Sequence, residues 1–435
     1  MSRASLENHW LPFTDNKTFK EDPRLLVKGD GVYLWNQHGE RLLDGSSGLF
    51  TTAAGHCRPE IAAAVAEQLG LLDYAPSFLR SHPRSFEVAN ALSKILPDPI
   101  NHVFFCNSGS ESVDTAMKMA LQYHVSRGEG QRNIFVSRDR AYHGVNLGGT
   151  SLSGMAMNRQ AFGATIPGVV HMRSTWDEQQ CFSQGQPLHR GAELADDLYR
   201  AVQTYGADRI AACFIEPIAG STGVLVPPVG YLERLREISS EHGILLVFDE
   251  VITGFGRTGE AFAAQAFDVL PDIITMAKAL TNGAQPMGAV AVRDSLYETV
   301  MAASPDDVVE FAHGYTFSAH PAACAAALAT LDIYAKEKLF ERARAMSDYF
   351  LEAFFSLQNL PVVADIRGYG MLAGLDVAVD GAPGVRGHRL QKRLFDAGLH
   401  VKATGDAVII APPLIAEKDQ IDEMCEILRE VLKTV

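Results

Sequence analysis

The chain has 435 residues, of which 47% are hydrophobic, a composition that suits a globular protein large enough for two or three domains. Its formal net charge of −14 argues against nucleic acid as a partner, because a phosphate backbone demands a basic face. No apolar run approaches the roughly 18 residues of a membrane span, and the N-terminal sequence MSRASLENHW lacks the apolar core of a signal peptide, so we expect a cytoplasmic protein with no membrane partner.

The first predicted elements form a hairpin near the N-terminus. Two strand-like runs, residues 32–35 and 40–44, enclose a turn that contains glycine. Strand and helix patterns then alternate through residues 55–330, which predicts an α/β fold with a mostly parallel sheet covered on both faces. We expect these residues to form the larger domain. Residues 331–435 would form a smaller α+β domain, which the N-terminal segment 1–54 would join.

A glycine-containing turn follows the strand-like run HVFFC at residues 102–106. The sequence NSGSE comes directly after this run, and apolar residues then recur at helical spacing from Val113 onward. Ser108 and Glu111 have the spacing of a capping box, which marks the start of a helix. Free backbone N–H groups and the positive end of the helix dipole would hold a phosphate dianion at this point. The alternative is an ordinary capped turn between a strand and a helix.

Two later candidates for buried strands each end beside a charged residue. The run GILLVF at residues 243–248 precedes Asp249, and the run IITMA at residues 273–277 precedes Lys278. In an open α/β sheet, chemistry collects outside the carboxyl ends of the strands, so both residues are candidates for one site. A carboxylate that keeps a heteroaromatic nitrogen protonated, beside an amine that forms an imine, is what pyridoxal phosphate requires. The alternative for Lys278 is a solvated lysine that opens a helix.

The chain resembles the class III aminotransferases in seven motifs that occur in the same order. They are NSGSE, AYHG, FIEP, LLVFDEVITGFGRTG, PDIITMAKALTNG, HGYTFSAHP and APPL. The resemblance runs from about Trp10 to the C-terminus. It implies the aspartate-aminotransferase-like fold of fold type I enzymes, with pyridoxal 5'-phosphate as cofactor. The segments HWLPF, VPPVGYL and HGYTFSAHPAACAA resemble most the β-alanine:pyruvate and ω-amino acid:pyruvate group. Such enzymes transfer a terminal amino group to pyruvate by a ping-pong mechanism.

The same resemblance implies a role for each residue of the expected site. Lys278 would be the Schiff-base lysine and the proton carrier, and Asp249 would hold the pyridine nitrogen protonated. The other implied cofactor contacts are Tyr142 and Val251 on opposite faces of the ring, Gly109 and Ser110 at the phosphate, Glu216 nearby, and Thr316 at the phosphate of a neighbouring subunit. Because Thr316 would serve the neighbour, the resemblance implies a homodimer or a dimer of dimers.

Departures from the family pattern bear on the choice of substrate. Many relatives place an arginine for a substrate carboxylate two residues before the alanine of APPL, where this chain has Ile409. The arginine of the group's valine-arginine pair is Lys402 here, and Phe50 replaces a common tryptophan, which widens the pocket. Phe78 and Arg80 lie in the segment SFLRSHP, which borders the substrate entrance in relatives, so Arg80 is a second candidate ligand for the carboxylate. We expect an ω-amine or ω-amino acid donor and a keto-acid acceptor.

Other classes of protein could account for some of these sequence motifs. The sequence GFGRTG at residues 254–259 matches the G-x-G-x-x-G motif of nicotinamide dehydrogenases and follows a strand. However, Asp249 and Glu250 precede its first glycine, where their charge would oppose a pyrophosphate. Racemases, aminomutases and decarboxylases share the cofactor and its lysine, and a non-enzymatic binding protein of the same fold is a further alternative. Six scattered cysteines without a C-x-x-C pair predict neither disulfides nor a metal site.

Overall fold

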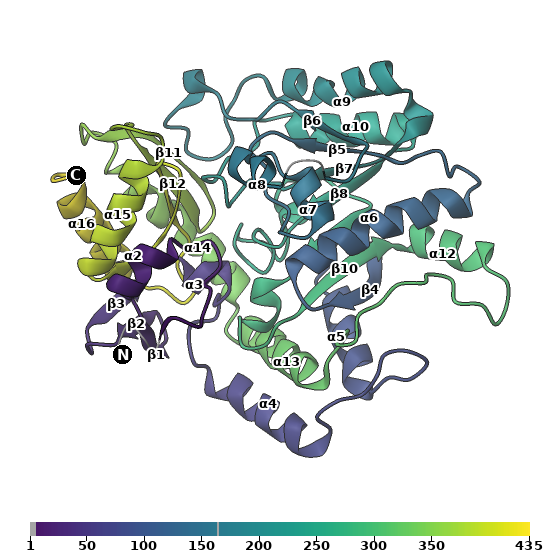
Figure 1. Cartoon of the computed structure of the whole chain (residues 1–435), viewed down its shortest axis with the longest axis horizontal. Coiled ribbons are helices and arrows are strands. Elements are labelled where there is room, and N and C mark those ends of the chain that lie inside the picture. The colour runs from purple at the N-terminus through teal and green to yellow at the C-terminus, as the bar shows by residue number, and fades with distance from the viewer. Residues whose placement is uncertain (1–5, 163–164) are drawn as a thin grey trace.

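The computed structural model describes residues 6–162 and 165–435, and a seven-stranded sheet forms its largest layer (Figure 1). The strand order is β4-β10-β9-β8-β7-β5-β6. Only the two pairs that contain β10 are antiparallel, so the predicted mostly parallel sheet is confirmed. The strands are β4 (Ile100–Cys106), β5 (Ile134–Arg138), β6 (Val169–Met172), β7 (Ile210–Ile215), β8 (Leu245–Asp249), β9 (Ile273–Met276) and β10 (Gly288–Arg293).

Helices cover both faces of this sheet. Successive side chains of β8 show this, because they belong alternately to two different apolar cores. Leu246 and Phe248 belong to one apolar core, which includes residues of α10, whereas Leu245 and Val247 belong to a second core, which includes residues of α6. A strand buried on both faces is apolar throughout, which explains the uninterrupted run in the sequence. The helices of this region are α4 (Pro59–Leu71), α5 (Pro83–Ser93), α6 (Gly109–Ser126), α7 (Leu147–Leu152), α8 (Ala156–Gln160), α9 (Gly191–Tyr205), α10 (Tyr231–His242), α11 (Ala263–Ala266) and α12 (Asp294–Ala303), with the short 3₁₀ helices η1 (Glu178–Gln180), η2 (Ala207–Arg209) and η3 (Lys278–Thr281).

The N-terminal and C-terminal segments lie side by side, purple beside yellow in Figure 1. They share the four-stranded sheet β1-β2-β3-β13, in which β3 and β13 are parallel, and the antiparallel sheet β11-β12-β15-β14 lies in the same region. The strands are β1 (Leu26–Asp30), β2 (Tyr33–Asn36), β3 (Arg41–Asp44), β11 (Val363–Tyr369), β12 (Leu372–Val377), β13 (Leu399–His400), β14 (Lys402–Thr404) and β15 (Ala407–Ile410). The helices are α2 (Asn16–Glu21), α3 (Ser47–Phe50), α14 (Leu339–Phe355), α15 (Val385–Asp396) and α16 (Lys418–Leu432).

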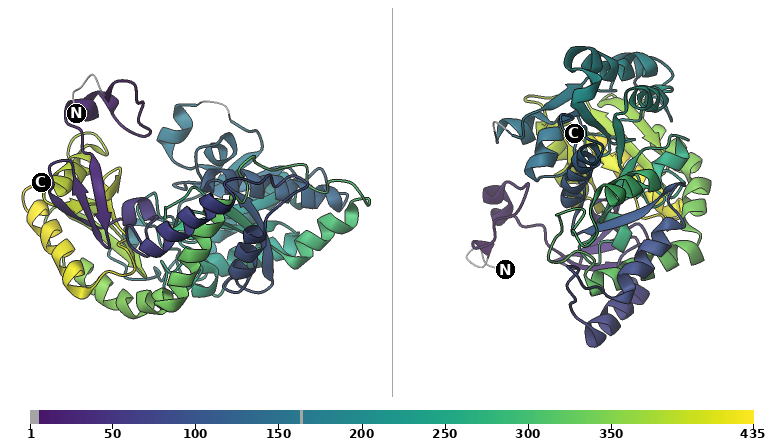
Figure 2. Two further views of the ribbon diagram at one scale, coloured as in Figure 1. Left: turned by 90° about the horizontal axis from the view of Figure 1, so that it is seen from below. Right: turned by 90° about the vertical axis from the view of Figure 1, so that its right-hand side faces the viewer.

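Helix α13 (Pro321–Lys336) connects the two regions, and with α14 it runs along one side of the molecule (Figure 2). It crosses the domain boundary expected at residue 330. The expected division at residues 54 and 330 stays a prediction. In the described part of the chain, no helix combines the length and the apolar sequence that crossing a membrane requires.

One predicted strand differs in extent from the structure for a local reason, and the predicted hairpin is present. Strand β8 begins at Leu245, two residues later than the apolar run suggested, because Gly243 ends α10 with a φ of 62°. A positive φ is open to glycine and ends a helix in the left-handed conformation. The predicted hairpin is confirmed in β2 and β3, which pair in register from Tyr33 opposite Leu43.

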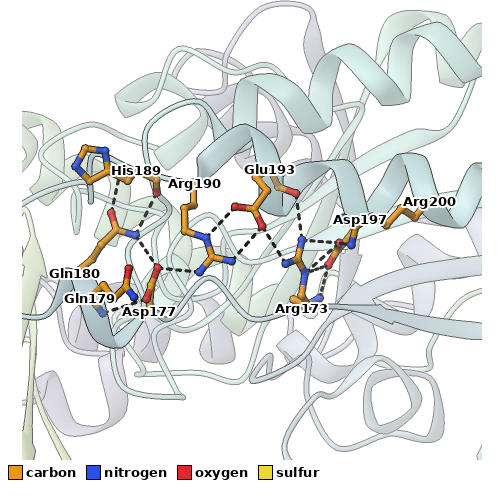
Figure 3. Close-up of polar contacts among 9 residues, drawn as sticks. All are labelled: Arg173, Asp177, Gln179, Gln180, His189, Arg190, Glu193, Asp197 and Arg200. Carbon is orange, nitrogen blue, oxygen red and sulfur yellow. Dashed lines mark hydrogen bonds and ion pairs between the residues drawn. The ribbon is translucent and has the colours of Figure 1, made fainter.

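The segment between β6 and α9 is held by a network of arginine and carboxylate side chains (Figure 3). Arg190 contacts Asp177 and Glu193, both at 2.9 Å, and Arg173 contacts Asp197 at 2.9 Å. Single exposed ion pairs stabilise a fold little, but this network anchors several turns of one segment together. The segment then reaches β11 through a backbone hydrogen bond from the amide of residue 185 to the carbonyl of residue 368 (2.9 Å). It therefore ties the region of the large sheet to β11.

Candidate active site

The candidate residues meet where parallel strands of the large sheet end. Asp249 is the last residue of β8, Glu216 follows β7 directly, and Lys278 begins η3 just after β9. The start of α6, the loop after β5 and the residues that follow β8 supply the others. A cavity of about 120 Å³ is lined here by Gly109, Ser110, Tyr142, His143, Gly144, Glu216, Asp249, Val251, Ile252 and Lys278. Every residue predicted to contact the cofactor lines this cavity, with the exception of Thr316.

The start of α6 supplies free backbone N–H groups to the cavity. Ser108 caps the helix, because its Oγ accepts a hydrogen bond from the N–H of Glu111 (3.2 Å). The Glu111 carboxylate reaches the N–H of Asn107 (2.7 Å), one residue before the position expected for a capping box. The first N–H groups of a helix have no partner within it, and the amides of Gly109 and Ser110 are among them. They are placed to bind an anion at the cavity wall.

Two glycines allow the start of α6 to pack closely against Val251, which follows β8, and against the loop after β5. A Cβ on Gly109 would lie 2.9 Å from Cγ1 of Val251. Gly144 has a φ of 90°, and a Cβ there would lie 2.5 Å from Oγ of Ser110. The same Oγ accepts a hydrogen bond from the N–H of Val145 (3.1 Å), which clamps the loop to the helix. Side chains at either glycine would close the space at the helix N-terminus.

Three hydrogen-bond donors converge on the buried carboxylate of Asp249. Oδ1 accepts from the hydroxyl of Thr275 (3.0 Å) and from the N–H of Val251 (3.2 Å). Oδ2 lies 2.8 Å from Nδ1 of His143, which donates because an ionised carboxylate only accepts. Donors on both oxygens stabilise the negative charge of Asp249 and fix its orientation. Asp249 thus presents an oriented carboxylate to the cavity.

His143 is a site residue that the sequence interpretation missed. Its side chain is buried, and Nε2 has no hydrogen-bond partner among the described residues. The motif AYHG pointed to Tyr142 alone. His143 and Asp249 are 106 residues apart, and no short-range pattern links them. The available signal was the histidine itself, a titratable side chain beside a residue expected to stack on the ring.

Lys278 lines the cavity and has an amine suited to nucleophilic chemistry. Burial lowers the pKa of Lys278 to about 8, against the opposing effect of the charges on Asp249 and Glu216. A larger fraction of neutral amine follows, and the neutral form is the nucleophile. Nζ lies 5.4 Å from the centre of the Phe50 ring. Lys278 does open a short helix, η3, but its side chain belongs to the cavity.

Glu216 is a buried acid in the wall of the cavity. Only 4% of its surface is exposed, and burial raises its pKa to about 7. Its Oε1 accepts a hydrogen bond from the backbone N–H of Tyr142 (2.9 Å), so it holds the loop that carries the predicted ring-stacking residue. Glu216 is therefore in place to position Tyr142.

Two of the departures from the family pattern, Lys402 and Ile409, are cross-strand neighbours. Lys402 on β14 lies directly opposite Ile409 on β15, and such partners share one face of a sheet. Ser46 joins them, because its Oγ accepts from the N–H of Lys402 (2.9 Å) and donates to the carbonyl of Ile409 (3.1 Å). Burial lowers the pKa of Lys402 to about 8, and its charge acts on Lys278. Lys402 is not among the residues that line the cavity, and its contact with a substrate stays a prediction.

Phe50 does not line the cavity either, and three further predicted residues also lie outside it. Phe78 and Thr316 are exposed, and so is Arg80, whose guanidinium donates to the carbonyl of Leu79 (2.6 Å). The carbonyl of Thr316 accepts a hydrogen bond from the hydroxyl of Tyr74 (3.0 Å). The segments around these residues therefore form one exposed surface, which we call the 74–80/316 surface.

The G-x-G-x-x-G turn at residues 254–259 is also away from the cavity. A Cβ on Gly256 would lie 2.6 Å from the ring of Phe340 and 2.7 Å from Cδ1 of Leu414. The glycine is therefore required by packing against α14 and the chain near residue 414. The turn does not present its N–H groups to a ligand in the way that a dinucleotide motif does.

Comparison with known proteins places the chain in a family. The family model described as aminotransferase class-III matches residues 16–432. The chain belongs to the class III aminotransferases. This aminotransferase is 48% identical to the omega-aminotransferase of Caulobacter vibrioides over 99% of its own length and 98% of that protein. It is 44% identical to the beta-alanine–pyruvate aminotransferase of Pseudomonas aeruginosa, over 100% of this chain and 97% of that one.

Solved structures support the same assignment. The omega transaminase from Pseudomonas jessenii in complex with PMP superposes with a TM-score of 0.94 at 31% identity, covering 99% of this chain and 97% of the other. The (S)-enantioselective omega-transaminase from Thermomicrobium roseum gives 0.93 at 35% identity, with 99% and 97% covered. The expected fold, reaction type and pyridoxal-phosphate cofactor of this aminotransferase are confirmed, since the family depends on that cofactor.

Proposed function

We propose that this aminotransferase moves the terminal amino group of an ω-amino acid or amine to pyruvate by the ping-pong mechanism of its family. Relatives named for β-alanine, ω-amino acids and pyruvate support the substrates. The observation that carries the proposal is the cavity, which joins the amine of Lys278, the carboxylate of Asp249 and the N-terminus of α6. A cytoplasmic location belongs to the same proposal, and the six free cysteines support it because cytosolic thiols stay reduced.

The residues of the cavity fit pyridoxal phosphate. Bound there, this cofactor supplies an electron sink for the carbanion that forms when the amine donor loses a proton. Asp249 would hold the ring nitrogen and Lys278 the aldehyde carbon. The orphaned Nε2 of His143 and the close glycine packing at α6 agree with a site shaped around a polar ligand. The phosphate would bind the amides of Gly109 and Ser110, and Tyr142 and Val251 would face the ring.

The side chains then divide the work of proton transfer. Nζ of Lys278 takes the proton from the donor carbon that bears the amino group, which requires the neutral amine that its lowered pKa provides. Three donors orient the carboxylate of Asp249, which would face the ring nitrogen of the bound cofactor. Glu216 holds Tyr142 over the cavity. The geometry therefore supports one lysine as both nucleophile and proton carrier.

Lys402→Ala is expected to raise the KM for pyruvate on the order of tenfold or more, because a hydrogen bond to a charged group is lost. Lys402→Arg is expected to lower it, since a guanidinium binds a carboxylate through two parallel bonds. Amine donors without a carboxylate should keep their KM in both variants. Steady-state kinetics check this, with Lys433→Ala at the exposed end of α16 as the matched control. An unchanged pyruvate KM in Lys402→Ala would make Arg80 the next ligand to test.

The pH dependence of the pyruvate KM checks the same prediction. Below the Lys402 pKa of about 8 the ammonium attracts the carboxylate, and above it the neutral amine does not. The KM should therefore rise as the pH is raised through this range. Lys278, which lines the cavity, also has a pKa of about 8, so kcat should change over the same range. In Lys402→Arg the guanidinium stays charged, so the rise in KM should vanish while the change in kcat remains.

We propose a homodimer or a dimer of dimers in which Thr316 binds the phosphate held by the neighbouring subunit. The 74–80/316 surface supports this, because Leu79 is 86% exposed and Phe78 and Phe317 are each 57% exposed. Grouped exposed apolar side chains mark interaction surfaces. Dilution to concentrations at which sedimentation detects only monomer should abolish activity and release the cofactor. A fully active monomer would contradict the shared site.

A further inference from the structure

The ammonium of Lys402 is held by a single side chain of its own strand. Residues two apart on a strand point to the same face, and Nζ of Lys402 donates to Oγ1 of Thr404 at 2.6 Å. The residues opposite them on β15, Ile409 and Ala407, offer no polar side-chain atom. Among the described residues Lys402 forms no ion pair. Thr404 is therefore the side chain that determines where this charge lies.

We propose that Thr404 is a positioning residue that fixes the Lys402 ammonium so that it is ready to bind the carboxylate of the substrate. This inference rests on the proposed role of Lys402 in binding pyruvate. Lysine carries a compact charge on a flexible four-carbon stem and, unlike arginine, has no rigid fork to orient it. Threonine is β-branched and stiff at χ1, so its hydroxyl has a fixed position on the strand. The hydroxyl supplies the orientation that the lysine lacks.

The hydrogen-bonding capacity of the ammonium agrees with this role. An ammonium group has three donors, and one of them is engaged by Thr404. The other two remain for the two oxygens of a carboxylate. The backbone of Lys402 is also fixed, because its N–H donates to Ser46 (2.9 Å). Both ends of the side chain are therefore restrained before a substrate arrives, which favours binding by reducing the ordering needed on association.

The test uses two substitutions of Thr404 in the holoenzyme. Thr404→Val keeps the branched shape without the hydroxyl, and Thr404→Ser keeps the hydroxyl. With one carboxylate-free amine donor, KM and kcat are measured for pyruvate and for a neutral aldehyde acceptor. For Thr404→Val we expect a pyruvate KM raised on the order of tenfold with kcat retained, the range of a hydrogen bond to a charged group. The aldehyde KM should not change, and Thr404→Ser should resemble the wild type.

Several outcomes would overturn the inference, and they differ from failure of the proposed function. An unchanged pyruvate KM in Thr404→Val, with a raised KM in Lys402→Ala, would leave Lys402 as the ligand and remove Thr404 as its positioning residue. If Lys402→Ala also leaves the KM unchanged, both assignments fail. Equal rises for pyruvate and aldehyde would indicate general distortion and overturn the role. Thr204→Val, on an exposed turn of α9, is the matched control. If thermal unfolding shows that the Thr404→Val variant is not folded, Thr404→Ala is measured in its place.

Discussion

Lys278→Ala is expected to abolish turnover while the fold and part of the cofactor binding remain. Proton transfer by a positioned side chain contributes about 10²–10⁴-fold to a rate. Loss of the covalent attachment between Lys278 and the cofactor adds to that effect. The fold should persist because the neighbours of Lys278 in η3, Ala279 and Leu280, provide the buried packing there. The measurement is the transamination rate at saturating donor and acceptor.

The Lys278→Ala experiment needs a control for the loss of a positive charge near the cavity and a check that the cofactor is still bound. Lys402→Ala removes a second buried lysine near the same site, and it should change KM for pyruvate far more than kcat. The absorbance of bound cofactor shows whether the phosphate contacts at α6 still hold it in Lys278→Ala. A purified variant that retains a tenth of wild-type transamination would show that Lys278 is not the catalytic amine.

Asp249→Asn is expected to slow the reaction on the order of 10²-fold or more, the effect of removing one preorganised electrostatic partner. The amide keeps the shape of the carboxylate but not its charge, so the ring nitrogen is no longer held protonated. Its NH₂ group would also face a donor, because Thr275, Val251 and His143 all donate to the carboxylate. The cofactor should stay bound through the α6 N-terminus.

Single-turnover measurement of donor deprotonation checks the Asp249 prediction, since it isolates the step that needs the electron sink. Asp332→Asn, at an exposed position on α13, is a matched control in which the same chemical change should have no effect. A near-normal deprotonation rate in Asp249→Asn would remove the electrostatic role. A normal rate with weak cofactor retention would instead indicate that Asp249 serves binding alone.

Short-range patterns in the sequence were sufficient to place the main site residues on their elements. The apolar run before Asp249 is continuous because β8 is buried on both faces, and this makes its end visible without a structure. The cap at Ser108 lies within three residues of its partner, so the start of α6 was predicted correctly. The order of motifs identified the family and with it the reaction type and cofactor. The roles of single side chains stay predictions.

Contacts between distant segments depended on the order and register of the strands, which neighbouring residues do not encode. The contact of His143 with Asp249 requires β5 and β8 to end at the same edge of the sheet. The pairing of Lys402 with Ile409 requires the register of β14 on β15, which also brings Thr404 onto the face of the ammonium. These interactions form only in the folded chain, because the strand order and register bring together side chains that are distant in the sequence.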